Sequence, residues 1–173
     1  LDGAALVCNG EIYNHEILAE RYGFVMETGS DCEVILHMFK RFGLRRTCDE
    51  LDGVFCFAIV DKGRLFIGRD PIGVRPLFLG WREDIHGQIE WLVSSEMKGL
   101  HHYCQFIEPF APGTCAVFNK ATRKKEQRRY YRYEYPVHRR FTEEGVMESI
   151  RKHLIAAVDK RMMSDRPIGC LLS

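Results

Sequence analysis

Runs of apolar residues predict that much of the chain forms β-structure. A run at 4–8 has the length of a strand, and a longer run at 51–60 is typical of a buried one. The tight turn Asp-Lys-Gly at 61–63 returns the chain along 64–70, and a further turn leads into 74–79. Because the last three strands are apolar along their length, we predict an antiparallel meander whose sheet is covered on both faces.

Shorter elements continue this pattern as far as residue 133. We predict strands at 89–93 and 115–118, a short helical piece at 94–100, and a loop at 107–114, where two prolines and a glycine occur. Basic residues and tyrosines are interleaved at 123–133, which is typical of a solvated hairpin.

Two stretches between the first strand and the second have helical spacing instead. Residues 16–22 place apolar side chains near one face and predict a short helix. A second helix is predicted to begin at a capping box formed by Ser30 and Glu33 and to end near Phe42. Asp31 would then lie in its first turn, where the helix dipole favours a negative charge.

One motif between two of the strands could be mistaken for a phosphate-binding loop. The stretch Gly-Arg-Asp-Pro-Ile-Gly at 68–73 has two glycines but no Gly-Lys-Ser or Gly-Lys-Thr. We therefore interpret Arg69 and Asp70 as a structural ion pair rather than as catalytic residues.

The C-terminal part of the chain has a different pattern. Residues 132–141 are charged, include Pro136 and lack apolar periodicity, which predicts a linker. After it, Thr142 can cap a helix that keeps helical spacing to Met162. The apolar run at 167–173 is then predicted to be a buried strand.

Composition and charge narrow the class of protein. The 173 residues are 46% hydrophobic and 28% charged, as in soluble globular proteins, and a net charge of +1 gives no field that would attract nucleic acid or an anionic membrane. We see no membrane-spanning run and no signal-peptide pattern, so we expect a cytoplasmic protein. Seven cysteines without a Cys-x-x-Cys pair favour buried, reduced thiols over disulfides or a zinc site.

Candidate chemistry begins where the first predicted strand ends, at Asn9 and Gly10. Glycine lets the chain turn and lets a ligand approach the backbone closely. An amide side chain beside a free backbone N–H supplies the two donors that an oxyanion hole requires. Glu11 adds a negative charge suited to holding an ammonium group. The alternative interpretation of Asn-Gly alone is a strand-to-loop turn with a polar cap.

The heptapeptide Asn-Gly-Glu-Ile-Tyr-Asn-His at 9–15 closely resembles a motif of glutamine-hydrolysing asparagine synthetases, which are class II glutamine amidotransferases. The resemblance extends to Thr-Gly-Ser-Asp-Cys-Glu at 28–33, Leu-Asp-Gly-Val-Phe-Cys-Phe at 51–57 and Gly-Cys-Leu-Leu-Ser at 169–173, and so covers nearly the whole chain. The fold that it implies is α+β, a four-layer αββα sandwich of the N-terminal-nucleophile type, here without its first strands.

The resemblance also implies roles for individual residues. Asn9 and Gly10 match the oxyanion hole for glutamine hydrolysis, and Glu11 and Asp31 match the residues that hold the α-amino group of glutamine. The family's nucleophile is an N-terminal cysteine whose own amino group is the base, and it would lie upstream of Leu1. We interpret both ends of the chain as cut. Because nucleophile, base and oxyanion hole act as a unit, we expect these residues alone to be inactive.

Two domains are implied. Residues 1–135 resemble the glutamine amidotransferase domain, shortened at its N-terminus, and residues 142–173 resemble the start of an α/β ATP-pyrophosphatase domain. In the intact enzyme of this family, aspartate is first adenylated with ATP and Mg²⁺. Ammonia released from glutamine then converts the adenylated aspartate into asparagine. Leu171 and Ser173 match positions beside the adenine and at the start of the phosphate loop. The resemblance implies no metal ligand here, and it allows for a homodimer.

Two other functions stay open from the sequence. The first is a binding or scaffold domain that resembles a glutaminase but never had the nucleophile, and the residue after the initiator methionine would distinguish it from the enzyme. The second is a nucleic-acid module that uses the basic run at 123–133, which the near-neutral net charge disfavours.

Overall fold

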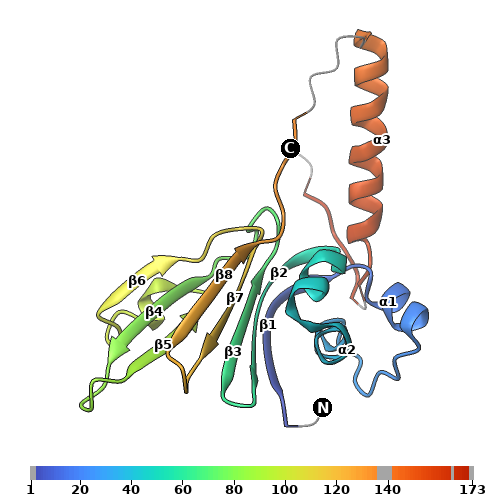
Figure 1. The fold of residues 1–173 in the computed structure, drawn as a ribbon. Coiled ribbons are helices and arrows are strands. Elements are labelled where there is room, and N and C mark those ends of the chain that lie inside the picture. The colour runs from blue at the N-terminus through green and yellow to red at the C-terminus, as the bar shows by residue number, and fades with distance from the viewer. Residues whose placement is uncertain (1–2, 136–141, 165, 172–173) are drawn as a thin grey trace. The chain divides into compact units, whose positions relative to one another are not determined.

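The computed structural model describes residues 3–135, 142–164 and 166–171, and it divides the chain into two compact units, Leu1–Arg132 and Tyr133–Ser173. The first unit combines two antiparallel sheets with two α-helices (Figure 1). In chain order the elements are β1 (Ala5–Ile12), α1 (His15–Tyr22), α2 (Glu33–Glu50), β2 (Gly53–Asp61), β3 (Arg64–Arg69), β4 (Phe78–Glu83), β5 (Ile89–Ser94), the 3₁₀ helix η1 (Met97–Gly99), β6 (Phe106–Pro109), β7 (Thr114–Asn119), β8 (Lys124–Arg129) and α3 (Glu143–Arg161).

The larger sheet has five strands in the order β1-β2-β3-β7-β8, all paired antiparallel. The predicted pairing of the second and third strands is confirmed by the register, in which Ala58 lies opposite Ile67. The turn between them has positive φ angles at Lys62 and Gly63, as expected for a tight hairpin. β1 is an edge strand, since in the described part of the chain it pairs with β2 alone.

The predicted meander is wrong in its third strand. β4 leaves the larger sheet and forms a second one, in the order β5-β4-β6. β6 occupies part of the predicted loop at 107–114, because its residues pair with β4 and Pro109 stands at its end, where a missing N–H is tolerated. The two sheets pack through a cluster of buried side chains from their strands and from residues directly beside β4 and β6, namely Cys56, Ile67, Leu77, Leu79, Phe110, Ala116 and Phe118.

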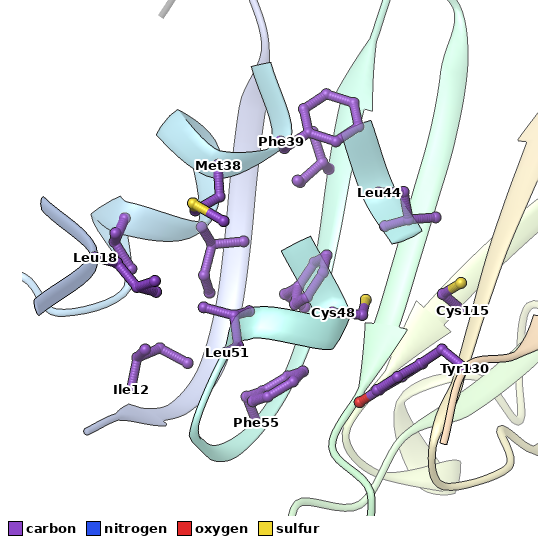
Figure 2. Close-up of a cluster of buried hydrophobic side chains, with 14 residues drawn as sticks. Ile12, Leu18, Met38, Phe39, Leu44, Cys48, Leu51, Phe55, Cys115 and Tyr130 are labelled. Atoms are coloured by element: carbon purple, nitrogen blue, oxygen red, sulfur yellow. The ribbon is translucent and has the colours of Figure 1, made fainter. Parts of the chain in front are cut away.

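The main core lies between the larger sheet and the two helices. In Figure 2, Leu18 of α1 and Met38 of α2 reach into the same cluster as Phe55 of β2. Burying each large apolar side chain contributes roughly 1.5–3 kcal/mol, so this cluster is the main source of stability for the unit. Its buried members are Ile12, Leu18, Val34, Ile35, Met38, Phe39, Leu44, Cys48, Leu51, Phe55, Phe57, Ile59, Cys115 and Tyr130.

α2 continues beyond its predicted end at Phe42. Gly43 has φ 79° and ψ 169°, which interrupts the helix and divides it into two pieces. The second piece places Leu44 and Cys48 in the main core. The apolar pattern predicted only the first piece, because these two positions stand among charged residues in the second.

The start of α2 also differs from the prediction. Cys32, not Ser30, is the N-cap residue, and its side chain makes no capping hydrogen bond. The carboxylate of Glu33 turns back into the preceding loop, where it accepts hydrogen bonds from the N–H groups of Glu27 and Thr28 at 2.7 Å each and from the Thr28 hydroxyl at 2.5 Å. The predicted capping box is therefore wrong, because the loop offers Glu33 more donors than a capping box would.

Arg69 and Asp70 organise the turn after β3 by binding the backbone rather than each other. Arg69 donates hydrogen bonds to the carbonyl oxygens of three residues, Gly73, Arg75 and Phe110. Their predicted structural role is confirmed, but the predicted ion pair is wrong. Asp70, only 1% exposed, accepts hydrogen bonds from the backbone N–H groups of Phe55, Ile72, Gly73, Val74 and Arg75.

The second unit contains α3, which begins as predicted. Thr142 Oγ1 accepts a hydrogen bond from the N–H of Gly145 at 3.2 Å. The predicted strand at 167–173 is wrong for the residues that are described, because 167–171 are exposed and have no strand partner. Of the predicted linker, 132–135 lack regular structure and 136–141 lie outside the described residues. Within the described ranges, no helix is long and apolar enough to cross a membrane.

Replacing Asp70 with alanine is expected to destabilise the first unit. Hydrogen bonds to a charged group are each worth roughly 1.5–3 kcal/mol, and the buried N–H groups would lose their acceptor, so the free energy of unfolding should fall by about 3 kcal/mol or more. Urea denaturation followed by circular dichroism measures the loss. Asp84→Ala is the control, because Asp84 binds the N–H groups of His86 and Gln88 in a surface turn. Equal losses in the two variants would contradict the special role of Asp70.

The contribution of Glu33 to stability is expected to depend on pH. Burial opposes its ionisation, but the donors on Glu27 and Thr28, together with His37, lower the pKa of Glu33 from 4.5 to about 2. The ionised carboxylate therefore stabilises the fold above pH 4.5, and that contribution disappears as the pH falls toward 2.

We expect Glu33→Gln to unfold at lower urea concentration than the parent at pH 7, with a difference that shrinks toward about pH 3. Glu20→Gln is the control, because Glu20 is an exposed carboxylate on α1. A difference for Glu33→Gln that stayed constant with pH would show that the charge of Glu33 is not the cause.

Candidate active site

The turn predicted at Asn9 and Gly10 is absent, because β1 continues through both residues to Ile12. Glycine is required here for a different reason. A Cβ atom on Gly10 would lie 2.1 Å from the carbonyl oxygen of Val54, so only glycine lets β1 and β2 approach this closely.

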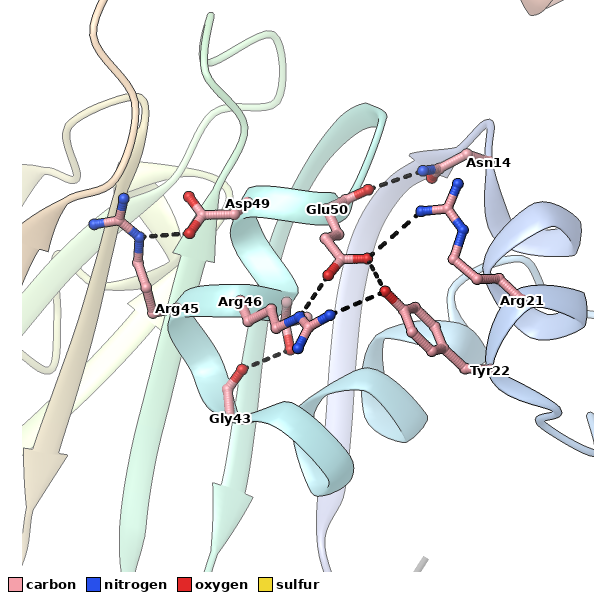
Figure 3. Close-up of polar contacts among 9 residues, drawn as sticks. Asn14, Arg21, Tyr22, Gly43, Arg45, Arg46, Asp49 and Glu50 are labelled. Atoms are coloured by element: carbon pink, nitrogen blue, oxygen red, sulfur yellow. Dashed lines mark hydrogen bonds and ion pairs between the residues drawn. The ribbon is translucent and has the colours of Figure 1, made fainter.

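The second half of the heptapeptide fastens the end of β1 to the end of α2 (Figure 3). Asn14 Nδ2 donates a hydrogen bond to the carbonyl oxygen of Glu50 at 2.8 Å, and Asn14 Oδ1 accepts one from the N–H of Asp52 at 3.0 Å. His15 Nδ1 lies 3.0 Å from the carbonyl oxygen of Ile12. Asn14 and His15 therefore hold the backbone that carries the candidate site.

Glu50 also joins the two helices beside this corner. Its carboxylate accepts hydrogen bonds from the Tyr22 hydroxyl at 2.5 Å and from Arg46 Nε at 2.6 Å, and Arg21 lies 3.9 Å away. The Tyr22 hydroxyl and the Arg46 guanidinium lower the pKa of Glu50. Figure 3 shows these groups pointing at the carboxylate from α1 and α2, so the negative charge is compensated on both sides.

Asn9 and Glu11 share one exposed face of β1, because alternate residues of a strand point to the same side. The side-chain amide of Asn9 donates a hydrogen bond to Ser95 Oγ at 3.1 Å. Ser95 directly follows β5, so the second sheet contributes to this corner. Ser95 was not predicted as a site residue, and the signal for it in the sequence was the Ser-Ser-Glu-Met-Lys-Gly-Leu stretch at 94–100.

Asp31 lies at the free edge of β1. It precedes α2 instead of lying in its first turn as predicted, and its Oδ2 accepts a hydrogen bond from the N–H of Ile12 at 2.6 Å. The next N–H, that of Tyr13, bonds to the carbonyl oxygen of Asp52 on the opposite side. Because N–H groups two residues apart point to the same side of a strand, the N–H of Gly10 points to the free edge with that of Ile12.

The structure thus brings all four predicted residues to one end of β1, in two orientations. Asn9 and Glu11 project from a face of the sheet, whereas the Gly10 N–H and the Asp31 carboxylate lie at its edge. Among the described residues, no group of three or more His, Cys, Asp or Glu could hold a metal ion. These four residues do not line the cleft of about 430 Å³ whose walls include Val60, Leu65, Trp91 and Phe118.

Cys56 lies directly opposite Asn9 in β2. Burial raises the pKa of its thiol, although the Ser95 hydroxyl and Arg69 act in the other direction. The thiol donates a hydrogen bond to the carbonyl oxygen of Pro76 at 3.4 Å. Burial and the hydrogen bond to Pro76 both disfavour the thiolate of Cys56, which is the nucleophilic form of a cysteine.

The positions predicted to contact ATP lie in the second unit. Leu171 is fully exposed and belongs to no strand. Ser173 lies outside the described residues, so the nucleotide roles of both remain predictions.

Sequence comparison places the chain among amidotransferases. A sequence profile of the glutamine amidotransferase domain matches residues 2–102. The chain is 39% identical to the glutamine-hydrolysing asparagine synthetase of Cricetulus griseus and 38% identical to asparagine synthetase B of Escherichia coli K12, each over 97% of its length. It spans only 33% and 30% of those two relatives.

Two solved structures share the fold. Glutamine phosphoribosylpyrophosphate amidotransferase from B. subtilis, in complex with ADP and GMP, matches 74% of the chain and 29% of its own, with a TM-score of 0.64 and 26% identity. An allosteric regulatory enzyme of purine biosynthesis matches 74% of the chain and 28% of its own, with a TM-score of 0.63 and 25% identity. The predicted α+β fold of the N-terminal-nucleophile type is confirmed, and the chain belongs to the glutamine amidotransferase domain family.

Proposed function

We propose that the chain is the glutamine-binding part of a glutamine-hydrolysing asparagine synthetase. The observation that carries the proposal is the hydrogen bond between Asp31 and the N–H of Ile12, which places a carboxylate at the strand edge to which the Gly10 N–H points. The similarity to asparagine synthetases over 97% of the chain supports the substrate class.

In this proposal Asn9 and Gly10 stabilise the negative charge that develops during glutamine hydrolysis. Attack on the side-chain amide of glutamine turns its carbonyl oxygen into an oxyanion, which preset N–H donors stabilise. Ser95 accepts one hydrogen of the Asn9 amide and leaves the other available for the oxyanion. The N–H of Gly10 supplies the second donor.

Glu11 and Asp31 are proposed to hold the α-ammonium group of glutamine. Two carboxylates at the end of one strand favour a cation through charge attraction and hydrogen bonding. The position of Asp31 is fixed on one side by the N–H of Ile12 and on the other by the loop that Glu33 anchors.

The nucleophile is proposed to come from outside these 173 residues, as an N-terminal cysteine whose amino group is the base. Cys56, the cysteine opposite Asn9, is buried and bound to the carbonyl oxygen of Pro76, which disfavours its thiolate and supports a source elsewhere. We therefore expect no glutamine hydrolysis by the 173-residue chain itself.

We further propose that the intact protein uses ATP, with Mg²⁺, and aspartate to accept the ammonia. Residues 142–173 would begin the domain that binds ATP, with Leu171 and Ser173 near the nucleotide. A cytosolic location is supported by the cysteines, all of which are free in the described part of the chain. The proposal also includes a homodimer of the intact protein.

Asn9→Ala in the intact synthetase should lower glutamine-dependent asparagine synthesis by roughly 10²–10³-fold, the usual cost of losing an oxyanion donor. Synthesis from added ammonia should be unchanged, because that route bypasses the oxyanion. Asn119→Ala is the matched control, because the Asn119 side chain accepts hydrogen bonds from the N–H groups of Ala121 and Thr122 in the β7–β8 turn. An equal loss from both nitrogen sources would contradict the role. Glutamine binding without hydrolysis by the intact parent would favour a binding domain instead.

The 173-residue chain should show no saturable ATP binding in calorimetry, whereas a longer protein that continues through the synthetase domain should bind ATP with Mg²⁺. The reason is that anion binding by phosphate loops depends on N–H groups at a helix start, and these would lie beyond residue 173. Saturable binding by the shorter chain would refute the domain assignment.

A further inference from the structure

Two thiols adjoin the candidate glutamine site and face each other. Cys8 precedes Asn9 on β1, Cys32 follows Asp31, and the two sulfur atoms lie 3.2 Å apart. We propose that Cys8 and Cys32 form an oxidation site, at which a small-molecule disulfide of the glutathione class converts the pair reversibly into an intrachain disulfide.

The geometry of the pair favours this reaction over oxidation of either thiol alone. Cys8 projects from the helix-covered face of β1, and Cys32 is the N-cap residue of α2. Cys32 Sγ also lies 3.8 Å from the carbonyl oxygen of Gly10, which keeps it against the strand edge. Bonded sulfurs are about 2.05 Å apart, so closure requires an approach of only about 1 Å.

Accessibility distinguishes this pair from a second one. Cys48 and Cys115 also interact, but they are 2% and 5% exposed in the main core (Figure 2). Cys8 and Cys32 are half-buried, so a small oxidant can reach them from solvent. We expect the core pair to stay reduced under conditions that oxidise the pair at the strand edge.

The order of reaction follows from the surroundings of each thiol. The contact with Cys32, together with burial and nearby acidic groups, raises the pKa of Cys8, so Cys8 stays protonated at neutral pH. Thiolates, not thiols, attack disulfides. Because Cys8 is held in its protonated form, we expect Cys32 to attack first.

The thiol–disulfide exchange takes place in two steps. Cys32 gives its proton to solvent and attacks one sulfur of glutathione disulfide, which forms a mixed disulfide and releases one glutathione thiolate. Cys8 then passes its proton to that thiolate and attacks Cys32 Sγ, which releases the second glutathione as a thiolate that takes up a proton from solvent. Two protein thiols are oxidised, one disulfide of glutathione is reduced to two thiols, and excess glutathione reverses the reaction.

The effect on glutamine hydrolysis rests on the proposed function. The disulfide would join the residue before Asn9 to the residue after Asp31. A displacement of about 1 Å in a positioning group is enough to reduce turnover up to about 10²-fold. We therefore infer that the oxidised form is the less active one, because closure shifts Asp31 relative to Glu11.

The test uses the 173-residue chain with mixtures of oxidised and reduced glutathione. After free thiols are blocked, peptide mapping by mass spectrometry should find Cys8 linked to Cys32 and all other cysteines alkylated, and dithiothreitol should remove the link. Cys8→Ser should stop at a stable glutathione adduct on Cys32, and Cys32→Ser should form no link. Cys104→Ser, a half-buried cysteine away from the pair, should retain it.

The outcomes separate the oxidation site from the proposed function. The oxidation site is overturned if the wild-type chain forms no link between Cys8 and Cys32, or if it links Cys48 to Cys115 instead. This result would not depend on the activity of the enzyme. If the link forms in the intact synthetase and glutamine-dependent turnover is unchanged, the inferred inhibition is wrong and the oxidation site stands. Circular dichroism of each variant confirms that it is folded.

Discussion

The close pairing of β1 with β2 is the constraint on which the candidate site depends. Gly10 and Gly53 both lie where a Cβ atom would meet the facing backbone, at 2.1 Å from the Val54 carbonyl oxygen and 2.2 Å from the Glu11 carbonyl oxygen. This pairing carries β1 straight through the Asn-Gly step and leaves its outer edge free in the described part of the chain. The Gly10 N–H and the Asp31 carboxylate both lie at that edge for this reason.

The same pairing separates the two kinds of contact that the heptapeptide makes. Residues whose side chains face away from the helices, Asn9 and Glu11, are exposed, whereas Ile12 enters the main core. Asn14 then uses both ends of its amide on the backbone of neighbouring segments. The heptapeptide at 9–15 therefore contributes residues of the candidate site and also the hydrogen bonds that hold those residues in place.

Sequence patterns were sufficient for the hairpin of β2 and β3, for α1 and α3, and for the family to which the chain belongs. They failed where a side chain had more than one possible partner. Glu33 could satisfy a capping box or a loop, and Asp70 could pair with its neighbour Arg69 or with backbone N–H groups. Which partner wins depends on the folded arrangement. Around Asp70, five backbone N–H groups converge on one buried carboxylate, and leaving such groups without an acceptor is costly.

An open strand edge is also a hazard, because its unpaired N–H and C=O groups are a template for strands of other molecules. In the described part of the chain β1 has such an edge, and Val7 on the exposed face of the same strand is 74% exposed. Asp31 accepts the hydrogen bond of the Ile12 N–H, which an incoming strand would otherwise use. Its negative charge also disfavours the approach of an apolar strand. Asp31, which is proposed to bind the amino group of glutamine, thus also opposes aggregation through this end of the sheet. Losing it would expose the chain to misassembly as well as to loss of its ligand.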